Sequence, residues 1–209
     1  TGSWTSWQVT ISASPINIAA SGGSSTITCS AVRTRNYTWN GVGTTHTDTE
    51  TATPTLSGSA SGFTLSGKTV TASNNTTTNS RSITITATSN SVSKSITITQ
   101  SAGAKVYGNW SSWSVSCSAS SYKVWAGGDS VTIYSSASRN RTWTWNGVAG
   151  SGGTESDSAT PTISVTSGVG VLSGNTLTFS NNTSPDARTT RVTANYNGVT
   201  DYCDVMQYG

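Results

Sequence analysis

The chain has 209 residues, of which 9% are charged and 33% apolar, and its formal net charge is +3 at neutral pH. This length suits one large domain or two domains of about 100 residues each. No apolar stretch is long enough for a membrane-spanning helix, and the small net charge gives no argument for a nucleic-acid partner.

The first segment, GSWTSWQV at residues 2–9, is repeated as GNWSSWSV at residues 108–115. Further matches follow in the same order: TWNGV at 38–42 and 144–148, ATPT at 52–55 and 159–162, and SNNT at 73–76 and 180–183. Such a repeat indicates two copies of one structural module. We predict modules at residues 1–102 and 108–209, joined by a short linker at 103–107.

The pattern inside each copy is typical of β-strands. STITCSA at 25–31, KTVTAS at 68–73, SITITATS at 82–89 and SKSITITQ at 93–100 alternate apolar and polar residues with period two. Glycine and asparagine separate these runs, as they do at turns. The expected fold is all-β, with two tandem immunoglobulin-like β-sandwich domains related by the internal repeat.

Asn-Gly occurs at residues 40–41 and again at 146–147, between strand-like runs. This pair predicts a two-residue hairpin turn, because both central residues of such a turn need positive φ. Counting back from the first turn places Arg33 near Asp48 on the neighbouring strand. Four acids at equivalent positions are therefore expected to form cross-strand pairs with arginines, or alternatively a weak Ca²⁺ site: Asp48, Glu50, Glu155 and Asp157.

One basic and aromatic segment appears twice, as RTRNYTWNGV at 33–42 and RNRTWTWNGV at 139–148. In a strand, alternate residues share a face, which here collects Arg33, Arg35, Tyr37 and Trp39 in one copy and Arg139, Arg141, Trp143 and Trp145 in the other. Ile27, Cys29 and Ala31 have the same parity and look buried. Because unpaired arginines cannot continue into a core, the strand is expected to bend near Val32.

Three interpretations of this segment stay open. WSSWS at 110–114 resembles the WSxWS motif of cytokine receptors, in which tryptophans stack with arginines of a neighbouring strand. By the same physics, a ladder would place Trp4, Trp7, Trp110 and Trp113 against the guanidinium groups. Alternatively, Trp39 and Trp145 are core tryptophans of the sandwich. The third interpretation is an exposed aromatic platform for sugar rings or bases.

Two of the three cysteines, Cys117 and Cys203, stand where the first copy has Ile11 and Ile96. The first and last strands of an immunoglobulin-like sandwich lie side by side. We therefore predict a Cys117–Cys203 disulfide, which would imply an oxidising compartment, with two buried thiols as the alternative. Cys29 is expected to be a lone buried thiol.

His46 is the only histidine, and cysteines at metal-ligand spacing are absent from the sequence. A hydrolytic triad and a zinc site therefore lack the residues that they need. We expect no enzymatic activity, no cofactor and no bound metal.

The segments AASGGSSTITCSA, YTWNG, SNNTTTNSRSITITAT and SKSITITQSA, with their counterparts in the second copy, resemble BACON domains. The resemblance covers nearly the whole chain and rests on turn and strand residues. It implies an immunoglobulin-like sandwich, often associated with carbohydrate binding, in surface proteins of gut bacteria or in structural proteins of their phages.

These observations lead to one main functional hypothesis. The protein is expected to be a non-enzymatic extracellular structural or adhesion module, at a cell surface or in a virion. Its expected partners are surface glycans or other subunits of such an assembly, without membrane insertion. A carbohydrate-binding module using exposed Trp and Tyr rings is the alternative, and single-stranded nucleic-acid binding is a minor one.

Overall fold

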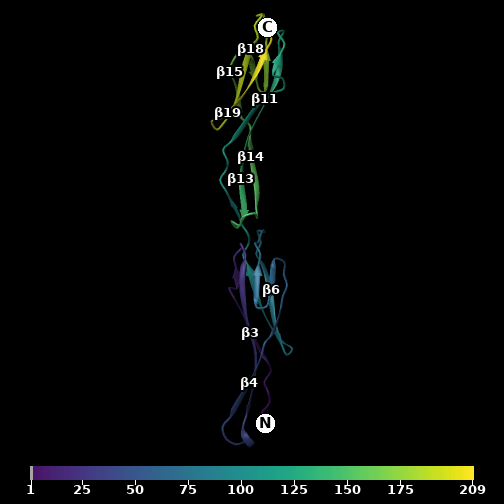
Figure 1. Cartoon of the computed structure of the whole chain (residues 1–209), viewed down its shortest axis with the longest axis vertical. Helices are drawn as coiled ribbons and strands as arrows, with labels where there is room; N and C mark the ends of the chain where they lie inside the picture. The colour runs from purple at the N-terminus through teal and green to yellow at the C-terminus, as the bar shows by residue number, and fades with distance from the viewer. Residues whose placement is uncertain (1) are drawn as a thin grey trace. The chain divides into compact units, whose positions relative to one another are not determined.

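The computed structural model describes residues 2–209 and consists of β-strands, with one short 3₁₀ turn at Trp39–Gly41 (Figure 1). The predicted all-β fold is confirmed. The chain divides into two compact units, one made of residues 1–106 with 144–153 and the other of residues 107–143 with 154–209. The segment 144–153, which contains the second Asn-Gly turn, thus groups with the first unit.

The first copy of the repeat folds into two sheets. One contains β1 (Gln8–Ser14), β3 (Gly23–Tyr37), β7 (Thr69–Ala72) and β6 (Phe63–Ser66) in this order, with β4 (His46–Ala52) also paired to β3. The other has the order β2 (Asn17–Ile18), β9 (Val92–Gln100), β8 (Arg81–Ser89) and β5 (Thr55–Ser57). The two sheets pack into a sandwich, as the alternating pattern predicts.

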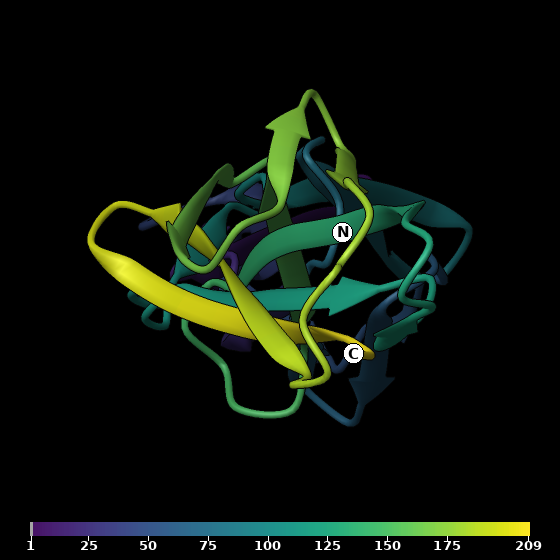
Figure 2. The same ribbon diagram turned by 90° about the horizontal axis from the view of Figure 1, so that it is seen from above.

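The second copy repeats this topology. Its larger sheet has the order β10 (Lys105–Tyr107), β13 (Asp129–Trp145), β17 (Thr176–Phe179) and β16 (Val171–Ser173), with β11 (Ser114–Ala119) and β14 (Gly153–Ala159) paired to β13. Its smaller sheet has the order β12 (Lys123–Val124), β19 (Val199–Gln207), β18 (Arg188–Tyr196) and β15 (Thr162–Ser167). The yellow strand β19 runs beside the teal strand β11 (Figure 2).

Each sandwich has a small apolar core between its sheets. In the first copy this core includes Ile18, Ile27, Val70, Ile83, Ile85 and Ile98, and in the second it includes Val131, Ile133, Leu177, Phe179, Val192 and Val205. Burial alternates along the strands, so that the threonines and serines between these residues face solvent. The period-two pattern of the sequence therefore predicts which residues face the core.

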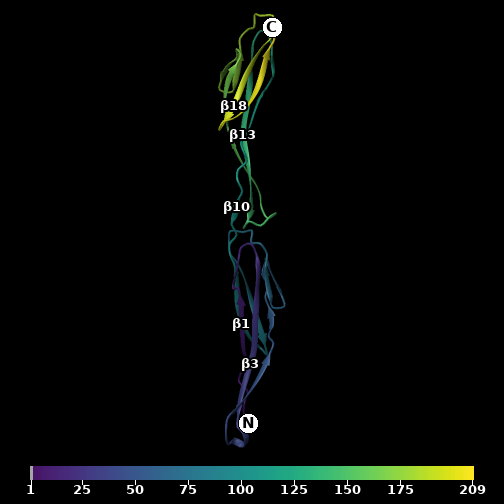
Figure 3. The same cartoon turned by 60° about the vertical axis from the view of Figure 1, so that its left-hand side comes forward.

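Strand β3 runs without a break from Gly23 to Tyr37, so the bend expected near Val32 is wrong. The strand β1 pairs with β3 only as far as Val32. Beyond this point β3 and β4 continue as a ribbon past the other strands of the unit (Figures 1 and 3). Arg33 and Arg35 stay on the face that holds Ile27 and Ala31, but what covers that face changes from apolar core to aromatic rings.

The Asn-Gly turns adopt the expected left-handed conformation, with φ of 51° and 74° at Asn40 and Gly41. The connection is longer than the predicted two-residue loop, because the last strand pair is Tyr37 with His46. The register therefore shifts by two residues, and Arg33 lies opposite Glu50 rather than Asp48. The predicted Arg33–Asp48 neighbourhood is wrong for this reason.

Candidate functional site: two arginine and aromatic ladders

The segment that carries Trp4 and Trp7 lies along the edge of β3 that β4 leaves open. A β-bridge joins Trp4 to Arg35, and the Thr5 N–H donates to the Thr34 carbonyl at 2.8 Å. In the second copy the Ser111 N–H donates in the same way to the Asn140 carbonyl at 2.7 Å. These backbone contacts bring each tryptophan pair alongside the two arginines of the neighbouring strand.

The first ladder consists of Trp7, Arg33, Trp4, Arg35 and Tyr37 in spatial order. The Arg33 Cζ lies 4.8 Å from the Trp7 ring centroid and 4.9 Å from that of Trp4. The Arg35 Cζ lies 4.7 Å from the Trp4 centroid and 5.9 Å from that of Tyr37. Each distance is within cation–π range, where one contact is worth about 0.5–2 kcal/mol.

The second ladder consists of Trp113, Arg139, Trp110, Arg141 and Tyr107. The Arg139 Cζ lies 4.5 Å from the Trp113 centroid and 4.7 Å from that of Trp110. The Arg141 Cζ lies 4.5 Å from the Trp110 centroid and 4.0 Å from that of Tyr107. Tyr107 was not among the residues expected from the sequence, because it precedes the repeated GNWSSWSV segment.

Each ladder arginine also binds one of the four predicted acids. Nη2-to-carboxylate distances are 2.6 Å for Arg33–Glu50, 2.8 Å for Arg35–Asp48, 2.8 Å for Arg139–Asp157 and 2.7 Å for Arg141–Glu155. In all four pairs the Nε–H of the arginine donates to the same carboxylate oxygen. Rings and carboxylates together thus occupy both the π-face and the donor edge of each guanidinium group.

These ion pairs are partly open to solvent. The side chains of Arg139 and Arg141 are 29% and 25% exposed, and those of their acids 38% and 43%. Solvent and salt therefore weaken the charge attraction, and ion pairs this open contribute little individually. The stacking of the rings on the guanidinium planes adds to this contribution and holds the arginines in place.

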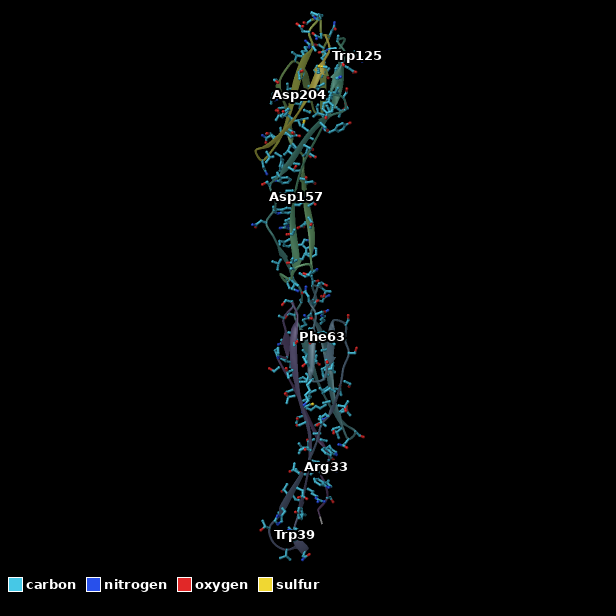
Figure 4. The ribbon with its side chains drawn as sticks, in the orientation of Figure 1. Arg33, Trp39, Phe63, Trp125, Asp157 and Asp204 are labelled. Carbon is cyan, nitrogen blue, oxygen red and sulfur yellow. The ribbon has the colours of Figure 1, made fainter. Side chains whose placement is uncertain are left out.

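The other aromatic residues of the repeated segment differ between the copies. Trp39 is 68% exposed at the tip of the β3–β4 hairpin, beyond Arg33 on the same ribbon (Figure 4). The core interpretation is therefore wrong for Trp39. Tyr37 stacks on His46 with 5.6 Å between ring centroids. Trp143 and Trp145 are half-buried.

A further cation–π pair in the second unit, outside the ladder, was missed by the sequence reasoning. The Arg191 Cζ lies 3.8 Å from the Tyr202 centroid, and both its Nε–H and Nη2–H donate to Asp204 at 2.8 Å. The hydrogen bond from Arg191 holds the pKa of the Asp204 carboxyl below its ordinary value. The first copy has Thr84 in place of Arg191, so the repeat gave no signal for this pair.

Buried glutamines end the last strand of both copies. Gln100 is fully buried, and its Nε2 donates to the carbonyls of Ala19, Ala20 and Ser73 at 2.8–3.2 Å. The Arg81 Nε–H donates to the Gln100 Oε1 at 2.7 Å. In the second copy Gln207 and Arg188 make equivalent bonds. Arg81 and Gln100, like Arg188 and Gln207, therefore hold the ends of their strands against the neighbouring turns by hydrogen bonds.

Cys117 on β11 and Cys203 on β19 lie together across the two sheets, with their Sγ atoms 2.9 Å apart. Both are free thiols in this structure, so the predicted disulfide is not formed here and stays a prediction. Burial, followed by the hydrogen bond with Cys117, raises the pKa of the Cys203 thiol to about 12. Cys29 is half-buried rather than buried.

Within residues 2–209, no cluster of three or more His, Cys, Asp or Glu side chains has a geometry suited to a metal ion. The acids of the weak calcium alternative each bind an arginine instead. Over the same residues the structure has no helix long and apolar enough to cross a membrane.

Part of the first copy matches one known family. Residues 44–101 match the BACON family model. Its description reads "Putative binding domain, N-terminal", and the match confirms the resemblance for this stretch. The matched BACON segment includes Arg81 and Gln100, which hydrogen-bond to each other, and the acids of the first ladder. No curated protein matches the chain.

Solved structures with immunoglobulin domains are similar at low identity. The N-terminal four Ig domains of Dscam1 isoform 7.44 are 8% identical, with 92% of this chain and 42% of that chain covered and a TM-score of 0.28. Extracellular domains 3–5 of Drosophila OTK are 10% identical, with 92% of this chain and 57% of that chain covered and a TM-score of 0.25. A chimeric titin Z1Z2 is 12% identical, with 98% of each chain covered and a TM-score of 0.25. The chain spans about half the length of the first two. At such scores the fold assignment rests on the strand pairing described above.

Proposed function

We propose that this protein is a non-enzymatic structural module of an extracellular assembly, built from two BACON-like sandwiches. One observation carries this proposal: the cationic and aromatic groups of both ladders are used internally. Each arginine binds a carboxylate through its edge and stacks on aromatic rings. A ligand that stacked on these rings or paired with these arginines would have to displace bonds already made.

The ladders suit a mechanical role. A two-stranded ribbon such as the outer part of β3 and β4 is marginally stable in water by itself. The stacked Trp and Arg side chains give this ribbon a packed face without an apolar core. The module can therefore project a hairpin tip beyond its sandwich, and the low content of charge fits a surface that packs against neighbouring subunits. The setting we propose is a cell surface or a virion.

Glycan binding through exposed rings is the second candidate, and one observation favours it. Trp125 is 76% exposed, and its ring centroid lies 5.3 Å from that of Tyr208 at an interplanar angle of 33°. An exposed pair of this kind could stack on the face of a sugar. Neither residue belongs to the ladders.

A glycan array and a stability measurement on the same variants separate the two candidates. The structural role predicts that Trp110→Ala lowers the stability and that neither the intact chain nor Trp125→Ala binds any glycan specifically. Specific binding that Trp125→Ala abolishes without loss of stability would replace the structural proposal by the second candidate. Specific binding that is lost only with Trp110→Ala, in a folded protein, would make the ladder itself a binding site.

A further inference from the structure

The turn at residues 144–148 is docked on the end of the sandwich in the first unit. The Asn146 Nδ2 donates to the Asn74 Oδ1 at 2.7 Å and to the Asn75 carbonyl at 2.9 Å. The Asn146 N–H donates to the Ala104 carbonyl, and the Ala104 N–H donates to the Asn146 Oδ1, both at 2.8 Å. One turn residue thus makes four hydrogen bonds with this end of the sandwich, which we call the Asn cap: Asn74, Asn75 and Ala104.

The Asn cap is a preformed receptor rather than a mobile loop. Asn75 is fully buried, and its Nδ2 donates to the carbonyls of Asn79 and Ser101. These bonds hold the Asn75 carbonyl in position for an incoming donor. Asn74 is half-buried beside it. The cap and the docked turn both lie within the first unit.

The second unit has an equivalent cap at Asn181 and Asn182, because SNNT is repeated at residues 180–183. The Asn182 Nδ2 donates to the carbonyls of Asp186 and Tyr208 at 2.9 Å, which reproduces the bonds of Asn75. The side chain of Asn181 is exposed at this cap. Asn181 and Asn182 are therefore the counterparts of Asn74 and Asn75, two of the three residues whose oxygens accept from Asn146, and the Asn181 side chain is open to solvent.

The first copy also has an equivalent turn, with the same TWNGV sequence at residues 38–42. Asn40 has φ of 51°, close to the 56° of Asn146, so its side chain leaves the same kind of turn. Trp39 and Val42 are 68% and 79% exposed, whereas their counterparts Trp145 and Val148 in the docked turn are half-buried. The undocked turn thus exposes the apolar surface that the docked turn partly covers.

Apolar surface is exposed at the second cap as well. Trp125 and Tyr208 stand where the first unit has Ala19 and Ser101, as the matching bonds from Gln207 and Gln100 to residues 125 and 19 establish. Trp125 is 76% exposed beside the C-terminal end of the second sandwich (Figure 4). The Asn182 N–H donates to the carbonyl of Ala126, the residue after Trp125, so a large exposed apolar ring belongs to the segment bonded to this cap.

From these matched surfaces we infer that the Asn40 turn of one copy of this chain docks on the Asn181 and Asn182 cap of a second copy. The occupant is a second copy because the chain already contains the same turn seated on the same cap. The contact joins two different surfaces, so association proceeds head to tail and does not stop at a symmetric dimer. This inference rests on the proposed assembly role and names the partner.

Sedimentation velocity over a concentration series tests the inference. Asn40→Asp keeps a residue that tolerates positive φ but replaces the donating amide with a carboxylate. We expect concentration-dependent oligomers of the intact chain, and an association constant at least roughly tenfold lower for Asn40→Asp. Asn197→Asp is the matched control, since Asn197 is exposed, precedes Gly198 and has φ of 50° in the β18–β19 turn. We expect it to associate as the unchanged chain does.

A mixing experiment tests the head-to-tail geometry. Asn181→Lys places a donor where Asn40 needs an acceptor, so this variant alone should associate as weakly as Asn40→Asp. An equimolar mixture of the two variants retains one intact turn and one intact cap, and it should form heterodimers. A form extended by Gly-Ala after Gly209, which supplies the counterparts of Gly103 and Ala104, should associate more tightly.

The inference is overturned if the intact and extended chains both stay monomeric over the series. It is also overturned if Asn197→Asp weakens association as much as Asn40→Asp does, or if the two variants do not complement each other in the mixture. A monomeric chain whose Trp110→Ala variant is destabilised and which binds no glycan would leave the structural role standing and refute only the docking.

Discussion

The Cζ of Arg139 on β13 lies 4.5 Å from the ring centroid of Trp113, which immediately precedes β11 in the second unit. Trp110 contacts Arg139 as well, at 4.7 Å, and it also contacts Arg141. The ring of Trp110 thus makes cation–π contacts with two guanidinium groups. The stability of the paired strands β13 and β14 should therefore depend on Trp110 more than on any exposed ring.

Replacing Trp110 with alanine should lower the free energy of unfolding by about 2 kcal/mol, because two cation–π contacts and the ring packing are lost together. Urea denaturation followed by fluorescence measures this change. Trp125→Ala, which removes an exposed ring of the same unit, should change the free energy of unfolding by less than about 0.5 kcal/mol. Equal effects of the two substitutions would refute a stabilising role for the ladder.

The ion pair between Arg191 and Asp204 should make the stability of the second unit depend on pH. The hydrogen bond from Arg191 lowers the pKa of Asp204 in the folded state, so the folded protein binds fewer protons than the unfolded chain near pH 4. The stabilisation from this ion pair is fully present above the pKa of Asp204 in the unfolded chain, and it is lost as the pH falls through the lower pKa of Asp204 in the folded protein. In an NMR titration, Arg191→Gln should raise the pKa of Asp204, whereas Lys123→Gln should not. An unchanged pKa in Arg191→Gln would contradict this assignment.

Mild oxidation should join Cys117 and Cys203. A disulfide between them would close a loop of 86 residues and stabilise the fold by about 4 kcal/mol. The thermal midpoint should rise on oxidation and return with reductant, and Cys203→Ala should abolish this response. Because the pKa of Cys203 is raised to about 12, alkylation of this thiol should be slow at pH 8. Rapid alkylation at that pH would show that the Cys203 environment differs from the one described.

Gln207→Leu should lower the free energy of unfolding by about 3 kcal/mol, since it leaves buried carbonyls and the Arg188 guanidinium without their partner. The Gln207 Nε2 donates to three carbonyls, of which Ser180 is the nearest at 2.8 Å. Gln8→Leu is the matched control, because Gln8 is exposed. Thermal denaturation of both variants measures the difference, and a tolerated Gln207→Leu would mean that the hydrogen bonds of Gln207 contribute little.

Much of the site could be predicted because its signals are local. Alternation along the strand identifies Arg33 and Arg35 as neighbours on one face, and the repeat assigns Arg139 and Arg141 the same positions. The acids two residues apart on the returning strand follow from hairpin pairing. The exact pairs did not follow, because the conformation of residues 38–45 sets the register and no local pattern encodes it.

By itself the sequence determined the repeated all-β modules, their core faces and the residue types that meet across the β3–β4 hairpin, because period-two alternation and internal repeats are properties of neighbouring residues. Only the tertiary structure decided that β3 continues without a break past Val32, that Trp39 is exposed, and that Asn146 but not Asn40 is docked on a cap. These outcomes depend on which surface covers a residue. Coverage comes from segments far away in the chain, and a strand of the same sequence pattern can face core, rings or water.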